Sequence, residues 1–326
     1  MQTIAVFRAE DFPVVEGVAE GEGITFADEL VMDDIYQLSR NAVRAPLSLR
    51  LRDGLNGFVI DESTSVGTVG NAVFLDSCVT MMTADSTTYE VLVLVEVADG
   101  ALEATHLLPL ANLLVATNYS LVGVDRDAAS TRFAEVACVS FTRGTHITMA
   151  SGEQRPIENL VVGDKVLTRD DGPQEVRWIG QTTLRAVGDF APIVITKGAL
   201  HNEQDLLVSP DHRLFVYQRQ DALGAGRSEV LVKVRHLVNG TTVYQRDGGF
   251  VDYFQLLFDE HQIIYAEGIA AESLLIDPRT RAALPDHVRT GARGRHGHRA
   301  HFDYEVQEKL AARPDAVELL RKASSS

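Results

Sequence analysis

The chain has 326 residues, of which 45% are hydrophobic and 23% are charged, and its net charge is −16. This length is sufficient for two domains with cores of their own, and the composition excludes a wholly disordered or fibrous protein. The charge is unevenly distributed, because residues 1–137 contain 7 Arg, no Lys and 21 acidic residues, whereas residues 277–326 carry a net charge of +3. The acidic front half argues against contacts with phosphates, so we expect no nucleic-acid partner.

No apolar run approaches the roughly 20 residues of a membrane-spanning helix. The N-terminus MQTIAVFRAEDF lacks the basic and apolar regions of a standard secretory signal. Two cysteines, Cys78 and Cys138, are too few for a disulfide framework or a four-cysteine zinc site. We therefore expect no membrane span, no cofactor and no metal, and a protein that is cytoplasmic or exported without a standard signal peptide. We interpret His296, His298 and His301 as part of a solvated tail.

In chain order, the first segment has the composition of short strands. TIAVF, LSLRLR, GFVID and TYEVLVLVEV are rich in β-branched and aromatic residues, and several are bounded by Gly, Asp or Asn. The stretch FADELVMDDIYQLSRNAV has a helical pattern, because Leu30, Ile35 and Leu38 could share one helix face. A polar link, VDRDAASTRFAEV, follows it. We predict an acidic, β-rich N-terminal domain over residues 1–130 and a junction over 131–139.

From residue 140 the pattern is again one of short strands and turns. HITMASGEQRPI predicts two extended pieces around a Ser-Gly turn, and KVLTRDDGPQEVRWIG predicts a hairpin that turns at Asp171-Gly172. Five further strand-like segments follow without a long helix. We predict an all-β domain over residues 140–276 and a short basic, partly helical tail over residues 277–326.

Three ordered blocks in residues 140–276 resemble the Hint module, the fold shared by hedgehog autoprocessing domains and inteins. The blocks are SFTRGTHITMASGEQRPIENLVVGDKVLTRDDG, DLLVSPDHRLFVY and YFQLLFDEHQIIYAEGIAAES. The resemblance is closest to the bacterial Hint-type domains of unassigned biology. It implies a Hint-type β domain that performs autocatalytic cleavage on its own polypeptide.

In this family, the side chain at the module's first position attacks the preceding carbonyl, the amide becomes an ester or thioester, and a second nucleophile releases the N-terminal segment. The amide nitrogen must be protonated to leave, and the tetrahedral intermediate needs hydrogen-bond donors. Within the SPDH block, the resemblance assigns the acid to His212 and its support to Ser209. Thr145 belongs to the first block. His261 in the closing block either assists proton transfer or is a structural histidine.

Two residues compete as the nucleophile. Counting back five residues from Thr145, as the spacing in the family requires, gives Ser140 and a Val139–Ser140 scissile bond. Chemistry favours Cys138 and the Ala137–Cys138 bond, because a thiol is the better nucleophile and a serine hydroxyl needs a well-placed base. Motif spacing therefore favours Ser140, and Cys138 stays open as the alternative.

The closing block departs from the intein pattern. Glu272 and Ser273 stand where inteins have His-Asn, so we predict cleavage without splicing, by an N-to-O or N-to-S acyl shift. The stretch RWIGQTT carries no acid at the position where hedgehog domains activate a sterol, so the resemblance implies water or an amine as the acyl acceptor. The alternative is a catalytically inactive Hint fold that serves as a structural or binding module, with an unknown partner for the acidic domain.

Overall fold

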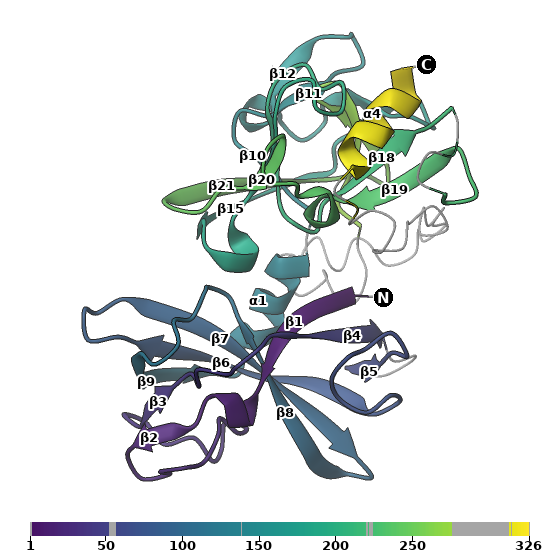
Figure 1. Cartoon of the computed structure of the whole chain (residues 1–326). Coiled ribbons are helices and arrows are strands. Elements are labelled where there is room, and N and C mark those ends of the chain that lie inside the picture. The colour runs from purple at the N-terminus through teal and green to yellow at the C-terminus, as the bar shows by residue number, and fades with distance from the viewer. Residues whose placement is uncertain are drawn as a thin grey trace. The chain divides into compact units, whose positions relative to one another are not determined.

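A computed structural model of the chain describes residues 2–51, 57–137, 139–219, 221, 224–275, 313 and 315–325. Within these residues the protein consists mostly of β-strands, with two short α-helices (Figure 1). This confirms the predicted all-β class. The chain divides into two compact units, the front unit (residues 1–135) and the second unit (residues 136–326). Neither described helix has the length and apolarity needed to cross a membrane.

Nine strands form a single sheet in the front unit. They are β1 (Gln2–Arg8), β2 (Val14–Glu16), β3 (Ile35–Gln37), β4 (Ala45–Leu51), β5 (Phe58–Ile60), β6 (Ala72–Met82), β7 (Thr88–Ala98), β8 (Ala101–Pro109) and β9 (Asn118–Asp125). Their order is β2-β3-β9-β6-β5-β4-β1-β8-β7. The long strand β6 also pairs with β7, so the sheet closes on itself. A short 3-10 helix, Ala9–Asp11, follows β1.

The helical pattern predicted over residues 26–43 is wrong. This stretch contains turns and strand β3. The buried carboxylate of Asp34 accepts hydrogen bonds from the backbone nitrogens of Val18 and Ala19 at 2.7 and 3.1 Å. These hydrogen bonds tie the segment to the loop that contains Val18 and Ala19. Tyr36 lies in the extended strand β3, and its side chain is buried. Tertiary hydrogen bonds and burial thus outweigh the local helical pattern.

The stretch VDRDAASTRFAEV, interpreted from sequence as a polar link, instead forms most of helix α1 (Ala128–Ala137). Ala129 and Phe133 lie one helical turn apart, and both are buried. The ring centroid of Phe133 lies 5.1 Å from that of Phe58, so this face packs on the front unit. Buried positions at helical spacing, with Ala134 beside Phe133, thus anchor a segment in which polar residues alternate with small apolar ones.

A buried contact between a carboxylate and an imidazole lies within the sheet of the front unit. Glu96 on β7 and His106 on β8 are at most 1% exposed, and His106 Nε2 lies 2.8 Å from Glu96 Oε2. Glu96 Oε1 accepts hydrogen bonds from Thr68 N and Asn71 Nδ2 at 2.9 and 2.7 Å. Burial raises the pKa of Glu96, but these hydrogen bonds together outweigh burial and hold the pKa below its usual range.

Replacing this carboxylate should destabilise the front unit. In a Glu96→Leu variant the buried His106 and the part-buried donors of Thr68 and Asn71 lose their acceptor, so we expect a loss of about 3 kcal/mol in the free energy of unfolding. Urea denaturation followed by circular dichroism measures it. Glu103→Leu, at an exposed position of β8, is the matched control. An equal effect of the two substitutions would contradict a stabilising role for the pair.

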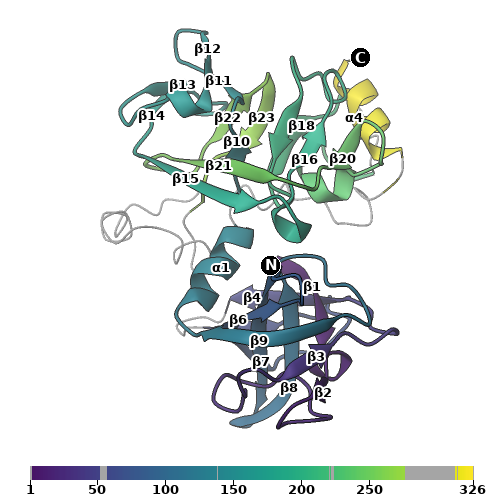
Figure 2. The ribbon, with the colours of Figure 1, turned by 90° about the vertical axis from the view of Figure 1, so that its left-hand side faces the viewer.

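Three sheets form the second unit (Figure 2). The first contains β10 (Phe141–Thr142), β15 (Trp178–Arg185), β16 (Ile193–Ile195), β17 (Leu206–Val208), β20 (Val243–Gln245) and β21 (Phe250–Leu257). The second contains β11 (His146–Thr148), β12 (Gln154–Pro156), β18 (Arg213–Tyr217), β19 (Glu229–Lys233), β22 (Ile263–Ala266) and β23 (Ile269–Glu272). The third is the hairpin of β13 (Lys165–Leu167) and β14 (Pro173–Glu175). Short 3-10 helices lie at Ile157–Asn159, Gly188–Phe190 and Val234–Leu237.

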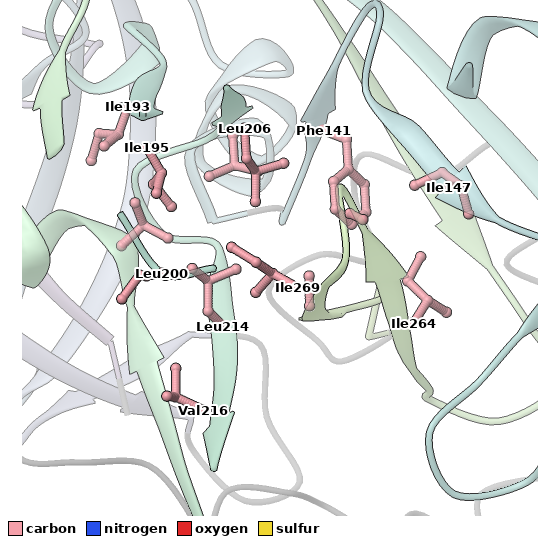
Figure 3. Close-up of a cluster of buried hydrophobic side chains, with 14 of the residues drawn as sticks. Phe141, Ile147, Ile193, Ile195, Leu200, Leu206, Leu214, Val216, Ile264 and Ile269 are labelled. Atoms are coloured by element: carbon pink, nitrogen blue, oxygen red, sulfur yellow. The ribbon is translucent and has the colours of Figure 1, made fainter. Parts of the chain in front are cut away.

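The strand orders are β15-β21-β10-β17-β16-β20 and β12-β11-β22-β23-β18-β19. Side chains from both sheets meet in one apolar core, as Figure 3 shows for Phe141, Leu206, Leu214 and Ile269. The β13–β14 hairpin confirms the turn predicted at Asp171-Gly172, since Gly172 has a φ of 65°, which favours glycine.

Helix α4 (Ala316–Ser325) belongs to the same core. Its residues Ala316, Val317 and Leu320 are at most 5% exposed. His201 Nε2 also lies 2.8 Å from the carbonyl oxygen of Arg321. The tail predicted from its basic composition is therefore in part a packed element of the second unit. The histidines of that tail, His296, His298 and His301, lie outside the described residues.

Candidate active site

The site is built around strand β10, which pairs with a neighbour on each side. Phe141 lies opposite Val208 of β17 and opposite Phe254 of β21, both antiparallel. In an antiparallel pair, one step back along one strand is one step forward along its partner. Ser140, the residue before β10, is therefore placed between the residues that follow Val208 and Phe254.

Those two residues are Ser209 and Gln255, and both bind Ser140. The backbone nitrogen of Ser140 donates to Ser209 Oγ at 3.0 Å, and the backbone nitrogen of Ser209 donates to the Ser140 carbonyl at 2.9 Å. Gln255 Nε2 donates to Ser140 Oγ at 3.2 Å. His212 Nδ1 lies 3.1 Å from the Ser140 carbonyl oxygen. The structure thus brings together three residues that the sequence singled out, Ser140, Ser209 and His212, and adds Gln255.

His212 is fully buried, with its ring centroid 4.4 Å from that of Phe141. Burial lowers the pKa of His212 from 6.5 to about 4, against the opposing effects of the Ser140 carbonyl and the Glu272 charge. The imidazole is therefore neutral at pH 7. Because a carbonyl oxygen only accepts, the ring proton is assigned to Nδ1. Nε2 then carries the lone pair, and it is buried without a hydrogen-bond partner among the residues that the structure describes.

This geometry bears on the acid predicted from sequence. The Ser140 nitrogen would be the leaving group of the cleavage. It donates its hydrogen bond to the hydroxyl of Ser209. His212 instead holds the carbonyl on the other side of Ser140. The imidazole fixes the backbone of Ser140, and the role of His212 as the acid stays a prediction.

Sequence reasoning missed Glu272 as a site residue. Its carboxylate is 1% exposed, and Arg213 donates to both of its oxygens. His261 Nε2 lies 2.9 Å from Glu272 Oε1. Burial raises the pKa of Glu272, but the charge of Arg213 and the hydrogen bond of His261 lower it to about 2. The signal in the sequence is a carboxylate at the end of the otherwise apolar strand IAAE.

The remaining predicted residues, Thr145, His261 and Cys138, do not take part in the hydrogen bonds of Ser140 that the structure describes. Thr145 donates its backbone nitrogen to the Thr142 carbonyl at 3.2 Å. Among the described residues no hydrogen bond joins the Thr145 side chain to Ser140 or His212. His261 contacts Glu272, which makes it part of a buried charge network. Cys138 lies outside the described residues. In the described part of the chain, no three His, Cys, Asp or Glu side chains gather as a metal site would require.

Comparison with known families identifies part of the second unit. The family model of the Hint domain matches residues 139–278. This part of the chain belongs to the Hint family. The match begins one residue before Ser140 and spans the Ser209 and His212 block and the Glu272 strand.

Other proteins resemble parts of the chain. Over 92 residues it is 35% identical to the catalytic subunit of the V-type proton ATPase of Candida tropicalis, a stretch that makes up 27% of this chain and 8% of that protein. The chain thus spans less than a tenth of this relative. Among solved structures, a variant of the Ssp DnaB mini-intein is 13% identical, with 43% of this chain and 97% of that one covered and a TM-score of 0.28. A gp41-1 intein variant is 15% identical, with 41% and 98% covered and a TM-score of 0.26.

The buried network of the Hint domain gives a first prediction for this site. A Glu272→Ala variant leaves the buried Arg213 without its counter-charge, so we expect a loss of about 3–5 kcal/mol in the free energy of unfolding. Chemical denaturation measures this loss. Glu260→Ala, an exposed position before β22, is the control. A loss no larger than that of the control would show that the network contributes little.

The buried imidazole gives a second prediction, on pH. Between pH 6.5 and 4 the unfolded chain takes up a proton on residue 212 that the folded domain does not, so stability falls as the pH falls through this window. The expected loss from this group is about 3 kcal/mol, at about 1.4 kcal/mol per pKa unit. Denaturation at both pH values, repeated with His212→Asn, measures it. The variant should lose less stability, and equal losses would contradict a buried neutral imidazole.

Proposed function

We propose that the Hint domain cleaves its own chain at the Val139–Ser140 bond by an N-to-O acyl shift and releases the preceding segment without splicing. The observation that carries this proposal is the 3.0 Å hydrogen bond between the Ser140 nitrogen and Ser209 Oγ. That nitrogen is the leaving group of the reaction, and the hydroxyl beside it is able to relay a proton. Both Ser140 and Ser209 are buried, so water does not compete strongly for these contacts.

The acyl shift needs only groups of the chain itself, and an outside molecule enters only in the last step, when the ester is cleaved. Ser140 Oγ attacks the carbonyl carbon of Val139, the C–Oγ bond forms, and the C–N bond breaks. The hydroxyl proton is lost from Oγ and the nitrogen gains one, with Ser209 as the relay. The product is an ester that links Val139 to Ser140, which now has a free α-amino group. Water or an amine then attacks the ester and releases the segment that ends at Val139.

The closing block supports cleavage without splicing. Splicing requires an asparagine at the end of the module, and Glu272 and Ser273 occupy that region. Glu272 is held by Arg213 and His261, and Ser273 Oγ accepts a hydrogen bond from the Gln262 backbone nitrogen at 2.9 Å. Neither side chain provides the amide nitrogen that a cyclisation needs.

A second candidate is an inactive Hint fold that serves as a structural or binding module. One observation favours it. Ser140 Oγ accepts a hydrogen bond from Gln255, and among the described residues no carboxylate or imidazole is hydrogen-bonded to that hydroxyl to take its proton. A third arrangement, with Cys138 as the nucleophile, would place the cut two bonds earlier in the chain.

Intact mass of the freshly purified full chain, with and without hydroxylamine or dithiothreitol, separates these candidates. We expect fragments ending at Val139 that disappear in Ser140→Ala and form about 100-fold more slowly in Ser209→Ala, because the proton relay is lost. His212→Ala should also reduce them.

Other outcomes assign the other candidates. Fragments ending at Ala137 would move the nucleophile to Cys138. A single uncut mass under all conditions would overturn autoprocessing by this chain and leave the structural or binding module.

A further inference from the structure

Gln255 is a contact of the Ser140 hydroxyl that neither the motif pattern nor the proposed reaction assigns. It lies on β21, between β10 and β15, and its partner on β15 is Gly180. The antiparallel register therefore places Gly180, Gln255, Ser140 and Ser209 in one row across four strands. The side chain of Gln255 is half-buried, and its Nε2 donates a hydrogen bond to Ser140 Oγ at 3.2 Å.

The neighbouring strand is shaped to leave room for this amide. A Cβ atom at Gly180 would lie 3.0 Å from Gln255 Oε1 and 2.2 Å from a ring carbon of Trp178. A side chain at residue 180 would thus collide with the indole and press on the amide. Glycine weakens a strand interior, so a buried glycine in the middle of β15 marks a close approach by other groups. The absence of a side chain at Gly180 therefore leaves the Gln255 amide its place beside Ser140.

We infer that Gln255 is a catalytic residue of the cleavage, acting as the hydrogen-bond donor that stabilises negative charge on Ser140 Oγ. This inference rests on the proposed function. When Oγ gives up its proton, which passes to the Ser140 nitrogen, the oxygen is alkoxide-like until its new bond to the Val139 carbonyl carbon has formed. An N–H donor already aimed at that oxygen stabilises it with little reorganisation. Among the described residues no carboxylate or imidazole forms a hydrogen bond with this hydroxyl, so we expect the contribution of Gln255 to matter.

The chemistry of the nucleophile distinguishes this role from simple packing. A thiol has a pKa near 8.5 and ionises without help, whereas a serine hydroxyl depends on its surroundings. Sulfur is also a weak hydrogen-bond acceptor. The requirement for Gln255 should therefore be strong when residue 140 is serine and weak in a Ser140→Cys variant. A packing role would be the same in both backgrounds.

The experiment compares hydroxylamine-driven cleavage of the full chain by intact mass in four proteins: wild type, Gln255→Leu, Ser140→Cys, and the double variant. We expect Gln255→Leu to slow formation of the fragment ending at Val139 by about 10- to 100-fold in the serine background. In the cysteine background the same substitution should change the rate by less than about threefold. Gln181→Leu, an exposed glutamine of the adjacent strand β15, is the matched control and should cleave at the wild-type rate.

Gln255→Glu keeps the shape of the side chain and covers the case in which Gln255→Leu fails to fold. An ionised glutamate accepts but does not donate, so it should also slow cleavage, and faster cleavage would overturn the donor role. Equal slowing by Gln255→Leu in both backgrounds, or none in the serine background, would overturn this inference alone. No Val139 fragment from either wild type or Ser140→Cys would overturn the proposed function and this inference with it.

Discussion

Pairing of Phe141 with strands on both of its sides is the constraint on which the site depends. Two residues form strand β10, yet the strand lies between β17 and β21, so backbone hydrogen bonds fix its neighbours on both edges. The buried Phe141 ring sets the depth of the strand in the core, and it packs against the His212 ring. Because Ser140 directly precedes Phe141, the same pairing fixes the position of its backbone. Ser209 and His212, from one segment, engage its nitrogen and carbonyl, and Gln255 of β21 engages its hydroxyl.

The buried charges of Arg213 and Glu272 give the site its second support. His212 precedes strand β18, and Glu272 ends strand β23, which pairs with β18. The Arg213–Glu272 ion pair links the two strands next to His212, and the negative charge of Glu272 acts on the imidazole. Burial nevertheless dominates the pKa of His212. The domain therefore keeps a neutral histidine beside a fixed carboxylate, an arrangement that depends on excluding water from both.

Local patterns predicted local structure in the second unit. The turn at Asp171-Gly172 formed as expected. The resemblance to the Hint module selected Ser140, Ser209 and His212, which do meet in space, although their roles stay predictions. Features that depend on distant contacts were not predictable in this way. Gln255 is selected by strand register, and Glu272 becomes a site residue through Arg213, which lies about 60 positions earlier in the chain. The helical pattern over residues 26–43 failed for the same reason, since Asp34 is bound by backbone groups of another loop.

The hydrogen bonds around Ser140 also determine how the domain bears mechanical load. Strand β10 is held on both edges by antiparallel pairs, at Phe141 with β17 and at Phe141 and Thr142 with β21, and these pairs oppose a pull along the strand. A force applied to the chain before residue 139 reaches these pairs through the peptide bond between Val139 and Ser140. The proposed cleavage bond therefore carries this tension immediately before the hydrogen bonds of Ser140 and the sheet take it up.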